Sequence, residues 1–215
     1  ERSESISAVD VTPGETNEAH CLPSLADQHE ANTGLEVETV VADSKYGTVE
    51  NFLACHGRNI RAHIPDLKET QRGRRQDIFP EDAFKYDQDT DTYICPAGKS
   101  LLLRKHRKKR QANEYSCSKK VCQSCRLRDQ CTKSKTGRTI KRHHRHEDLE
   151  LMRSRARKRQ AKKDIRTRQH LMERSFARAC RYGFKRSRWR MLWKNKIQEY
   201  LTAAIQNIMV LLARN

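Results

Sequence analysis

The chain has 215 residues, 35% of them hydrophobic and 33% charged, and its 8 Gly and 5 Pro are too few for a collagen-like or low-complexity protein. No apolar run approaches the roughly 18 residues of a membrane span, and residues 1–20 contain no signal-peptide core, so we expect a cytoplasmic protein without a membrane partner. The net charge of +18 is unevenly distributed, because residues 1–94 carry 9 basic against 19 acidic side chains and residues 95–215 carry 36 against 8.

The strongly basic second part indicates a polyanionic partner, since so many positive charges repel one another unless they are neutralised. Nucleic acid is the commonest such partner. Solvated helix faces are the alternative explanation, but they account poorly for an excess of 28 positive charges, which is the difference between 36 and 8. The composition therefore predicts contact with nucleic acid.

The chain begins with a predicted strand and a predicted helix. Residues 4–12 alternate enough for a strand, which Pro13-Gly14 would end. Residues 15–32 carry apolar side chains at helical spacing, and Gly34 is a stop signal after them.

A strand, a helix and another strand are predicted next. Residues 37–43 suit a buried strand that places Asp43 at its carboxyl end. Thr48 is a candidate N-cap for the helix that follows, and residues 59–64 predict the next strand. The order of these elements predicts an α/β fold with a mixed sheet flanked by helices.

The rest of the chain predicts a less ordered middle followed by helices. Residues 72–75 predict an exposed loop, residues 93–140 a small hairpin-based knuckle, and residues 147–181 one long basic helix. The final stretch has an apolar stripe at helical spacing, which should pack on the core. Its members are Ile197, Leu201, Ala204, Ile205, Ile208 and Leu212.

Five of the eight cysteines fall between residues 95 and 131. In a reducing cytosol such a cluster indicates metal ligands rather than disulfides. The Cys-x2-Cys turn at Cys122 and Cys125 points two thiolates at one tetrahedral ion, and Cys95-Pro96-Ala97-Gly98 resembles the opposite knuckle. The candidate zinc ligands are Cys95, Cys122, Cys125 and Cys131, with Cys117 able to replace Cys95. A set of free thiols is the alternative interpretation.

Two carboxylates are candidates for binding magnesium. Asp43 would stand at the tip of a buried strand, where ligand sites of open sheets lie, although a turn-forming aspartate has the same local sequence. Glu173 falls in line with Phe176 and Cys180 on a helical face, where a carboxylate that points inward needs a cation or an arginine as partner. Together, Asp43 and Glu173 suggest a Mg²⁺ site for phosphodiester chemistry.

Four ordered segments resemble the DDE transposases of bacterial insertion sequences. Residues 40–52 are similar to the segment around the second catalytic aspartate of this family. Residues 173–177 and the arginine-rich residues 186–190 resemble the segment around its catalytic glutamate, and residues 197–208 resemble its closing helix. The cysteine pattern of residues 93–131 resembles the cysteine-rich insert of one branch.

The resemblance implies a ribonuclease H-like mixed sheet with flanking helices, interrupted by the cysteine-rich insert and closed by C-terminal helices. Residues 1–65 would form the first part of the catalytic core, residues 66–146 the insert, and residues 147–215 the helical completion of the core. Asp43 and Glu173 would be the second and third of three acidic residues that bind two Mg²⁺ or Mn²⁺ ions. In the family these ions serve DNA strand cleavage and transfer.

Departures from the family pattern predict that this polypeptide alone does not cleave DNA. The first catalytic aspartate of the family is expected shortly before the segment that matches residues 4–12, and this chain starts too late to include it. Asp10 does not replace it, because Asp10 falls at a later point of the family pattern. The family often has an acidic residue and a lysine where this chain has Arg178 and Cys180. We therefore expect the C-terminal portion of a transposase, or a decayed copy, associated with the bacterial nucleoid. A homodimer is a candidate assembly.

Basic side chains in the insert and in the long helix are expected to contact DNA phosphates, which would position the duplex and make binding salt-sensitive. An alternative function is a non-catalytic zinc-knuckle protein that binds DNA or RNA through its basic half. A structural RNA-binding protein of ribosomal type is a third, and it leaves residues 1–65 unexplained. The predicted DNA contacts are Lys105, Arg107, Lys108, Lys109, Arg142, Arg153, Arg155, Arg157 and Lys158.

Overall fold

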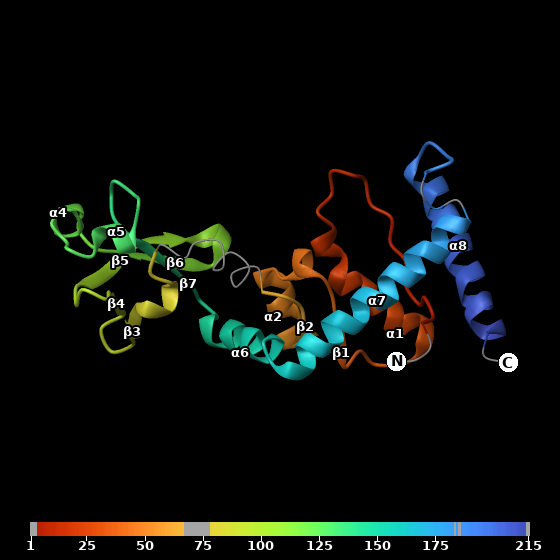
Figure 1. Ribbon diagram of the computed structural model, residues 1–215, viewed down its shortest axis with the longest axis horizontal. Helices are drawn as coiled ribbons and strands as arrows, with labels where there is room; N and C mark the ends of the chain where they lie inside the picture. Colours follow the sequence, from red (N-terminus) through yellow and green to blue (C-terminus); the bar gives the residue numbers. More distant parts are fainter. Residues whose placement is uncertain (1–3, 67–77, 183, 185, 214–215) are drawn as a thin grey trace. The chain divides into compact units, whose positions relative to one another are not determined.

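The computed structural model describes residues 4–66, 78–182, 184 and 186–213, and Figure 1 labels its elements. The chain forms two compact units: the first consists of Glu1–Leu67 and Asp148–Asn215, and the second of Lys68–Glu147. The division expected from the sequence lies within two residues of these boundaries, but its assignment to a catalytic core and an insert stays a prediction. The loop expected at residues 72–75 lies outside the described residues.

The first unit begins without the strand predicted for residues 4–12, and this prediction was wrong. A strand needs a neighbouring backbone to pair with, and here a side chain takes that place. The Ile6 N–H donates to Asn207 Oδ1 at 2.7 Å, and Asn207 Nδ2 donates to the Ile6 carbonyl at 2.8 Å. Glu4 also forms ion pairs with Arg174 and Arg178. The segment is thus held by long-range side-chain contacts that local alternation does not reveal.

The helix predicted before Gly34 is confirmed. A 3-10 turn, η1 (Glu18–Cys21), is capped by the Asn17 side chain and leads into α1 (Leu22–Thr33). Gly34 follows with a left-handed φ of 69°, a conformation that glycine adopts without a steric penalty from Cβ.

The predicted strand–helix–strand order is confirmed between residues 39 and 63. β1 (Thr39–Val41) and β2 (Arg61–His63) pair in parallel as a two-stranded sheet. They are joined by the 3-10 turn η2 (Ser44–Tyr46) and by α2 (Val49–Gly57). The Thr48 hydroxyl accepts the Asn51 N–H at 3.2 Å, as expected for the N-cap. In the described part of this unit, the mixed sheet expected from the sequence is reduced to this parallel pair.

The core of the first unit joins the parallel pair to a helix from the second half of the chain. Phe52 of α2 and Ile64 after β2 are completely buried. They pack in one cluster with Leu149 and Met152 of α6 (His146–Ala156). Distant parts of the sequence therefore build this core together.

The single helix predicted for residues 147–181 is instead two helices, because α6 ends at Ala156 and α7 (Arg159–Arg181) begins after an extended Lys158. Ala156 and Ala161 are both buried. Two residues that are five positions apart on one straight helix point in directions that differ by roughly 140°. The break between the helices therefore allows both alanines to turn inward. The sequence around Lys158 contains neither Gly nor Pro, so no local signal marks the break.

The last helix, α8 (Leu192–Leu212), forms as predicted but presents the opposite face to the unit. Its buried residues are Thr202, Ala203, Gln206 and Val210, whereas Leu201 of the predicted stripe is 61% exposed. The expectation that the apolar stripe packs on the core was wrong. Gln206 Oε1 accepts the Ser175 hydroxyl of α7 at 2.9 Å, so a polar contact decides the orientation.

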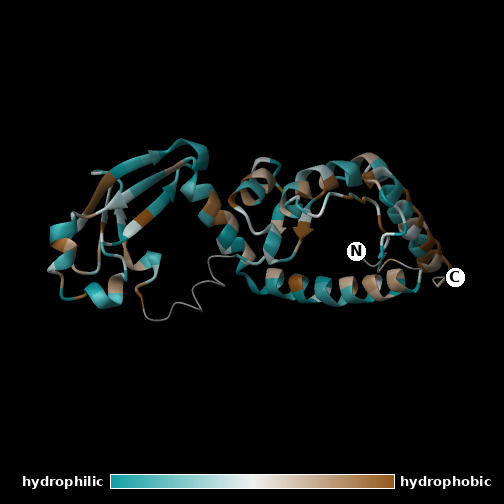
Figure 2. Cartoon of the chain, turned by 90° about the horizontal axis from the view of Figure 1, so that it is seen from above, coloured by the Kyte–Doolittle hydropathy of each residue, from teal (hydrophilic) through white to brown (hydrophobic). Residues whose placement is uncertain are grey.

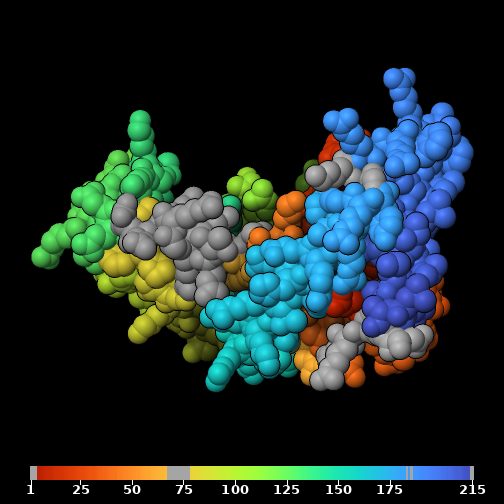
Figure 3. Space-filling view, turned by 45° about the vertical axis from the view of Figure 1, so that its right-hand side comes forward, coloured from red at the N-terminus to blue at the C-terminus, as the bar shows by residue number. Residues whose placement is uncertain are grey.

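Two views help to follow the exposed residues of α8. Hydrophobic colours gather along α8 in Figure 2. Figure 3 shows the same helix, in dark blue, at the surface of the first unit. α8 packs against α7.

The second unit is a five-stranded antiparallel sheet in which the strands follow one another in chain order. It is larger than the small knuckle predicted for residues 93–140. Its strands are β3 (Lys85–Asp87), β4 (Thr92–Ile94), β5 (Ser100–Arg107), β6 (Ala112–Ser116) and β7 (Thr139–His143). Its short helices are η3 (Glu81–Ala83), η4 (Lys108–Arg110), α4 (Lys119–Gln123) and α5 (Arg128–Cys131).

Aromatic side chains form the core of this sheet. Tyr93 and Tyr115 are buried with their ring centroids 5.1 Å apart, and Tyr86 lies 5.0 Å from Tyr93. Asp91 accepts hydrogen bonds from the Tyr115 and Tyr86 hydroxyls at 2.6 and 2.8 Å. One carboxylate therefore satisfies two tyrosine hydroxyls at the edge of this core.

Candidate functional site

Asp43 lies directly after β1, as the sequence predicted, and starts the η2 turn. Its carboxylate is half-buried, and Oδ1 accepts the Lys45 N–H at 2.8 Å. The Lys45 ammonium forms an ion pair with Glu18 at 2.6 Å. Asp43 thus has the turn-capping role considered as the alternative in the sequence.

The turn after Asp43 is held by contacts that the sequence did not suggest. Asn51 is buried, and its Nδ2 donates to the carbonyls of Ala19 at 2.9 Å and Tyr46 at 3.0 Å. A Cβ on Gly47 would lie 2.4 Å from the Pro65 carbonyl oxygen, so this position admits only glycine without a shift of the backbone. Asn51 and Gly47 are therefore positioning residues for Asp43. The sequence signal for Asn51 is a polar side chain on the inner face of a short helix.

A second helix reaches the surroundings of Asp43 through Arg168. Burial raises the pKa of the Tyr46 hydroxyl, and the carboxylates of Glu18 and Asp43 raise it further, whereas the Arg168 guanidinium acts in the opposite direction. On the same helix, Asp164 Oδ2 lies 2.7 Å from His63 Nδ1 at the end of β2. One side of α7 thus faces the carboxyl ends of both strands.

Glu173 is on α7 but points away from this side. It is exposed, and its Oε1 accepts a hydrogen bond from Gln169 Nε2 at 3.2 Å. Phe176, which shares its helical face, is 54% exposed, so the interpretation of this stripe as inward-facing was wrong. The inner face of α7 combines the buried Ala161 and Ala179 with polar side chains such as Asp164 and Ser175, and apolar periodicity detects such a mixed face poorly.

The structure records no contact between Asp43 and Glu173. In the part of the chain that it describes, no group of three or more His, Cys, Asp or Glu side chains is arranged to hold a metal ion. The described carboxylates therefore do not make up a complete magnesium site by themselves.

The predicted DNA-contact residues differ in their availability. Lys105, Lys108 and Lys109 are exposed at the end of the β5–β6 hairpin, and Arg155 and Lys158 are exposed at the turn between α6 and α7. These five side chains are exposed and within the described residues form no ion pair, so they are available to phosphates.

Two further predicted contacts lie beside carboxylates of their own unit. Arg107 lies 3.0 Å from Glu114, and Arg157 lies 3.8 Å from Glu150. A phosphate would have to compete with these carboxylates.

The last two predicted contacts are engaged internally. Arg142 lies over the Tyr86 ring, 3.8 Å from its centroid, and forms an ion pair with Glu147. Arg153 is 3% exposed, and its guanidinium lies 3.3 Å from Asp66 and 2.9 Å from Glu150. The prediction that Arg153 contacts DNA was wrong, because burial and these carboxylates take it away from the surface.

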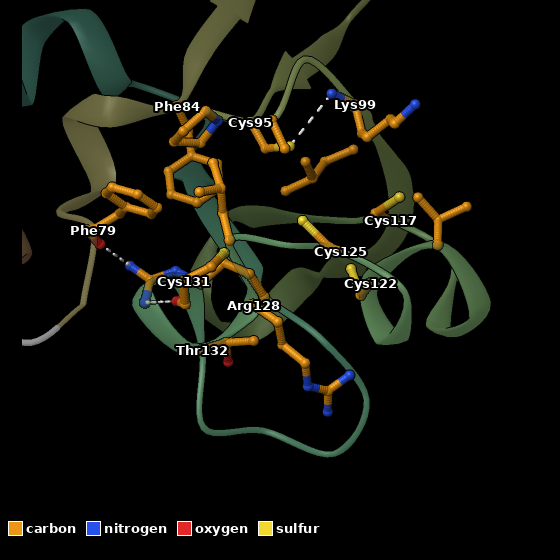
Figure 4. Close-up of a pocket in the computed structure, with 16 residues that line it drawn as sticks. Phe79, Phe84, Cys95, Lys99, Cys117, Cys122, Cys125, Arg128, Cys131 and Thr132 are labelled. Atoms are coloured by element: carbon orange, nitrogen blue, oxygen red, sulfur yellow. Dashed lines mark hydrogen bonds between the residues drawn. The ribbon is translucent and has the colours of Figure 1, made fainter.

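The candidate zinc ligands lie around one cavity in the second unit (Figure 4). Cys95 follows β4, Cys122 belongs to α4, Cys125 follows α4 and Cys131 ends α5. Cys117 lines the same cavity. All eight cysteines have free thiols.

The comparison with protein families decides what kind of protein carries these features. A family model described as a transposase DDE domain matches residues 94–212, more than half of the chain. The chain belongs to this family. Membership of the transposase DDE domain family implies a role in transposition, with DNA as the substrate.

The transposase match covers only part of the predicted site. It spans Glu173, the candidate zinc ligands and all the basic residues predicted to contact DNA, whereas Asp43 lies before it. No curated protein and no solved structure gives a significant match to this transposase chain. Among its described helices, none is both long and apolar enough to cross a membrane.

Proposed function

We propose that this chain is the part of a DDE transposase that supplies the second and third catalytic carboxylates, Asp43 and Glu173, together with a basic DNA-contact surface. The observation that carries the proposal is the family match, which includes the segment around Glu173. Asp43 is assigned by its place at the carboxyl end of a strand in a parallel β–α–β unit. The parallel pair and the helices on it are also what we take as the remnant of a ribonuclease H-like core.

We further propose that the chain does not cut DNA by itself. The support is physical: phosphodiester cleavage in this family needs divalent ions held by three carboxylates, and no such group stands ready among the described residues. Asp43 and Glu173 are then two parts of an incomplete set. They would bind Mg²⁺ or Mn²⁺ only weakly in the isolated chain.

Basic residues on both units would hold the duplex. Lys105, Lys108 and Lys109 lie together at one hairpin end, so they can follow successive phosphates of one strand. Arg155 and Lys158 offer a second contact region in the first unit. Homodimer formation and association with the nucleoid remain parts of this proposal.

The carboxylate assignment is tested by Mn²⁺ binding. Titration of the chain with Mn²⁺ in the presence of duplex DNA, followed by the electron paramagnetic resonance signal of the free ion, should reveal a weak site. For the two carboxylates to share an ion, α7 would have to turn Glu173 toward the carboxyl end of β1 when DNA binds. We then expect Asp43→Asn and Glu173→Gln each to remove the site, because each removes one anionic ligand. Glu15→Gln changes an exposed carboxylate elsewhere in the first unit and should leave binding unchanged.

The same experiment separates the two candidate functions. The cysteine-lined cavity favours the alternative of a non-catalytic zinc-knuckle protein that binds nucleic acid. If Mn²⁺ binding is identical in the wild type, Asp43→Asn and Glu173→Gln, the catalytic assignment fails and the alternative is the better description. Cleavage of duplex DNA by the isolated chain would contradict the proposed inactivity.

A further inference from the structure

The cavity in the second unit is unusual in its lining. It has a volume of about 40 Å³, enough for an ion, and five of the eight cysteines of the chain line it (Figure 4). These cysteines come from three separate segments: one after β4, one after β6, and the α4–α5 region. Together, these segments close one end of the sheet.

The turn at Cys95 is built to present a sulfur atom. The Cys95 carbonyl accepts the Gly98 N–H at 2.8 Å, and the Cys95 N–H donates to the Lys99 carbonyl at 2.9 Å. The Lys99 N–H then donates to Cys95 Sγ at 3.3 Å. Gly98 has a φ of +70°, which such a tight turn requires. The turn therefore fixes the position of this sulfur atom at the cavity.

The turn at Cys122 provides the opposite side of the cavity. The Cys125 N–H donates to the Cys122 carbonyl at 3.4 Å, which closes the Cys-x2-Cys turn. A Cβ on Gly137 would lie 2.9 Å from Cys122 Sγ, so the backbone at Gly137 packs directly against this sulfur atom. The sulfur atoms of Cys95 and Cys122 are thus both held by tight turns that line this cavity.

Arg138 adds an independent sign of a missing anion. Its Nη1 and Nη2 atoms donate to the carbonyls of Cys131 at 3.5 Å and Phe79 at 3.3 Å. Its Nε is buried and is one of two such side-chain atoms, among the described residues, that lack a hydrogen-bond acceptor. An unpaired buried donor is costly, and a thiolate at Cys131 would supply an anionic acceptor beside it. Arg138 also lines the cavity, so its positive charge would offset the negative charge of thiolates there.

We propose that Cys95, Cys122, Cys125 and Cys131 bind one structural Zn²⁺ ion in this cavity, with Cys117 outside the coordination shell. The choice of Cys95 over Cys117 rests on the Lys99 N–H that already points at Cys95 Sγ. Four thiolates and Zn²⁺ carry a net charge of −2, and Lys99, Arg128 and Arg138 line the same cavity. Binding releases the four thiol protons to solvent.

The thiols are not at the spacing of a metal site as they stand, since no group of three or more potential ligands is arranged to hold an ion. Zinc binding therefore requires their side chains to turn inward and approach about 2.3 Å from the ion. The role of the ion would be to tie the α4–α5 region to the turn after β4. The short α4 and α5 helices, with only five and four residues, have little stability of their own.

The test uses the full chain, purified under reducing conditions, and measures zinc by mass spectrometry and by replacement with Co²⁺. We expect one zinc per chain and a Co²⁺ spectrum with the strong sulfur-to-metal bands of tetrahedral thiolate ligation. Cys95→Ser, Cys122→Ser, Cys125→Ser and Cys131→Ser should each weaken zinc binding by at least about tenfold. Cys117→Ser should retain one zinc and the same Co²⁺ spectrum.

Cys55→Ser and Cys180→Ser are matched controls, because these cysteines lie in the first unit. Removal of zinc by a chelator should increase hydrogen exchange in α4 and α5 and leave α2 unchanged. A reduced wild-type chain without zinc would overturn the proposal. So would a Cys117→Ser variant that loses zinc while Cys95→Ser retains it. This test is independent of the transposase proposal, since it requires no DNA and no Mn²⁺.

Discussion

The two units of this chain differ in how completely their strands are paired and their hydrophobic side chains are buried. In the second unit each of the three middle strands pairs on both sides, and five core residues led by Tyr115 are almost completely buried. In the first unit β1 has β2 as its partner, and α8 leaves Leu201 and Leu212 more than half exposed.

The difference reflects how far apart the interacting residues are in the sequence. The second unit is assembled from hairpins, in which each strand meets its neighbour after a short turn. The first unit brings residues 4–66 together with a segment that starts more than 80 residues later. The first unit has a well-packed core around Phe52, whereas apolar side chains of α8 at its edge stay exposed.

The largest expected effect concerns the centre of the first unit. Phe52→Ala should lower the free energy of unfolding of the first unit by about 3–5 kcal/mol, because the substitution opens a cavity where a side chain has 0% exposure. Leu201→Ala, on the exposed face of α8, should change it by no more than about 0.5 kcal/mol. Hydrogen exchange measured by mass spectrometry in increasing denaturant resolves the first unit from the second. A loss of several kcal/mol in Leu201→Ala would mean that this face is covered in solution.

The next effect concerns DNA affinity and compares basic residues on the two units. The paired changes Lys108→Glu with Lys109→Glu, and Arg155→Glu with Lys158→Glu, should each reduce the slope of log K against log salt concentration by roughly 1.8, at roughly 0.9 per phosphate contact. Fluorescence anisotropy with a labelled duplex at several salt concentrations measures this slope.

A matched pair controls for net charge in this experiment. Lys119→Glu with Lys120→Glu changes exposed lysines of α4 and should leave the slope unchanged. If this control lowers the slope as much as the other pairs, binding depends on total charge rather than on the hairpin end and the α6–α7 turn.

The smallest effect is a pH dependence specific to the second unit. Hydrogen bonds from the Tyr115 and Tyr86 hydroxyls hold the pKa of Asp91 below its ordinary value. A carboxylate with a lowered pKa in the folded state contributes stability above its unfolded pKa, and this contribution is lost as the pH falls through the folded pKa. We therefore expect the melting temperature of the second unit to fall as acid protonates Asp91, in a scan from about pH 6 to about pH 3.

Asp91→Asn should have a lower melting temperature at neutral pH and a weaker dependence on pH. Asp89→Asn, an exposed carboxylate in the same turn, should behave like the wild type. A pH profile that is identical in Asp91→Asn and the wild type would show that other carboxylates govern the acid response.

Local sequence by itself determined the elements whose signals lie within a few residues. Gly34 as the end of the first helix, the Thr48 cap and the position of Asp43 after β1 were all predicted correctly, because caps and turns depend on near neighbours. The family was also recognisable, because the order of its motifs can be read directly from the sequence. The cysteine spacing predicted ligands that the structure places around a single cavity.

Only the tertiary structure decided which faces of the helices turn inward. Hydrogen bonds and ion pairs over long sequence distances, such as Ser175 to Gln206 and Asp164 to His63, orient α7 and α8 with polar sides toward the unit. Apolar periodicity assumes that burial follows hydrophobicity, and it therefore assigned the wrong faces to Glu173 and Leu201. The burial of Arg153 against Asp66 has the same origin, because a charge is buried only where folding provides its partner.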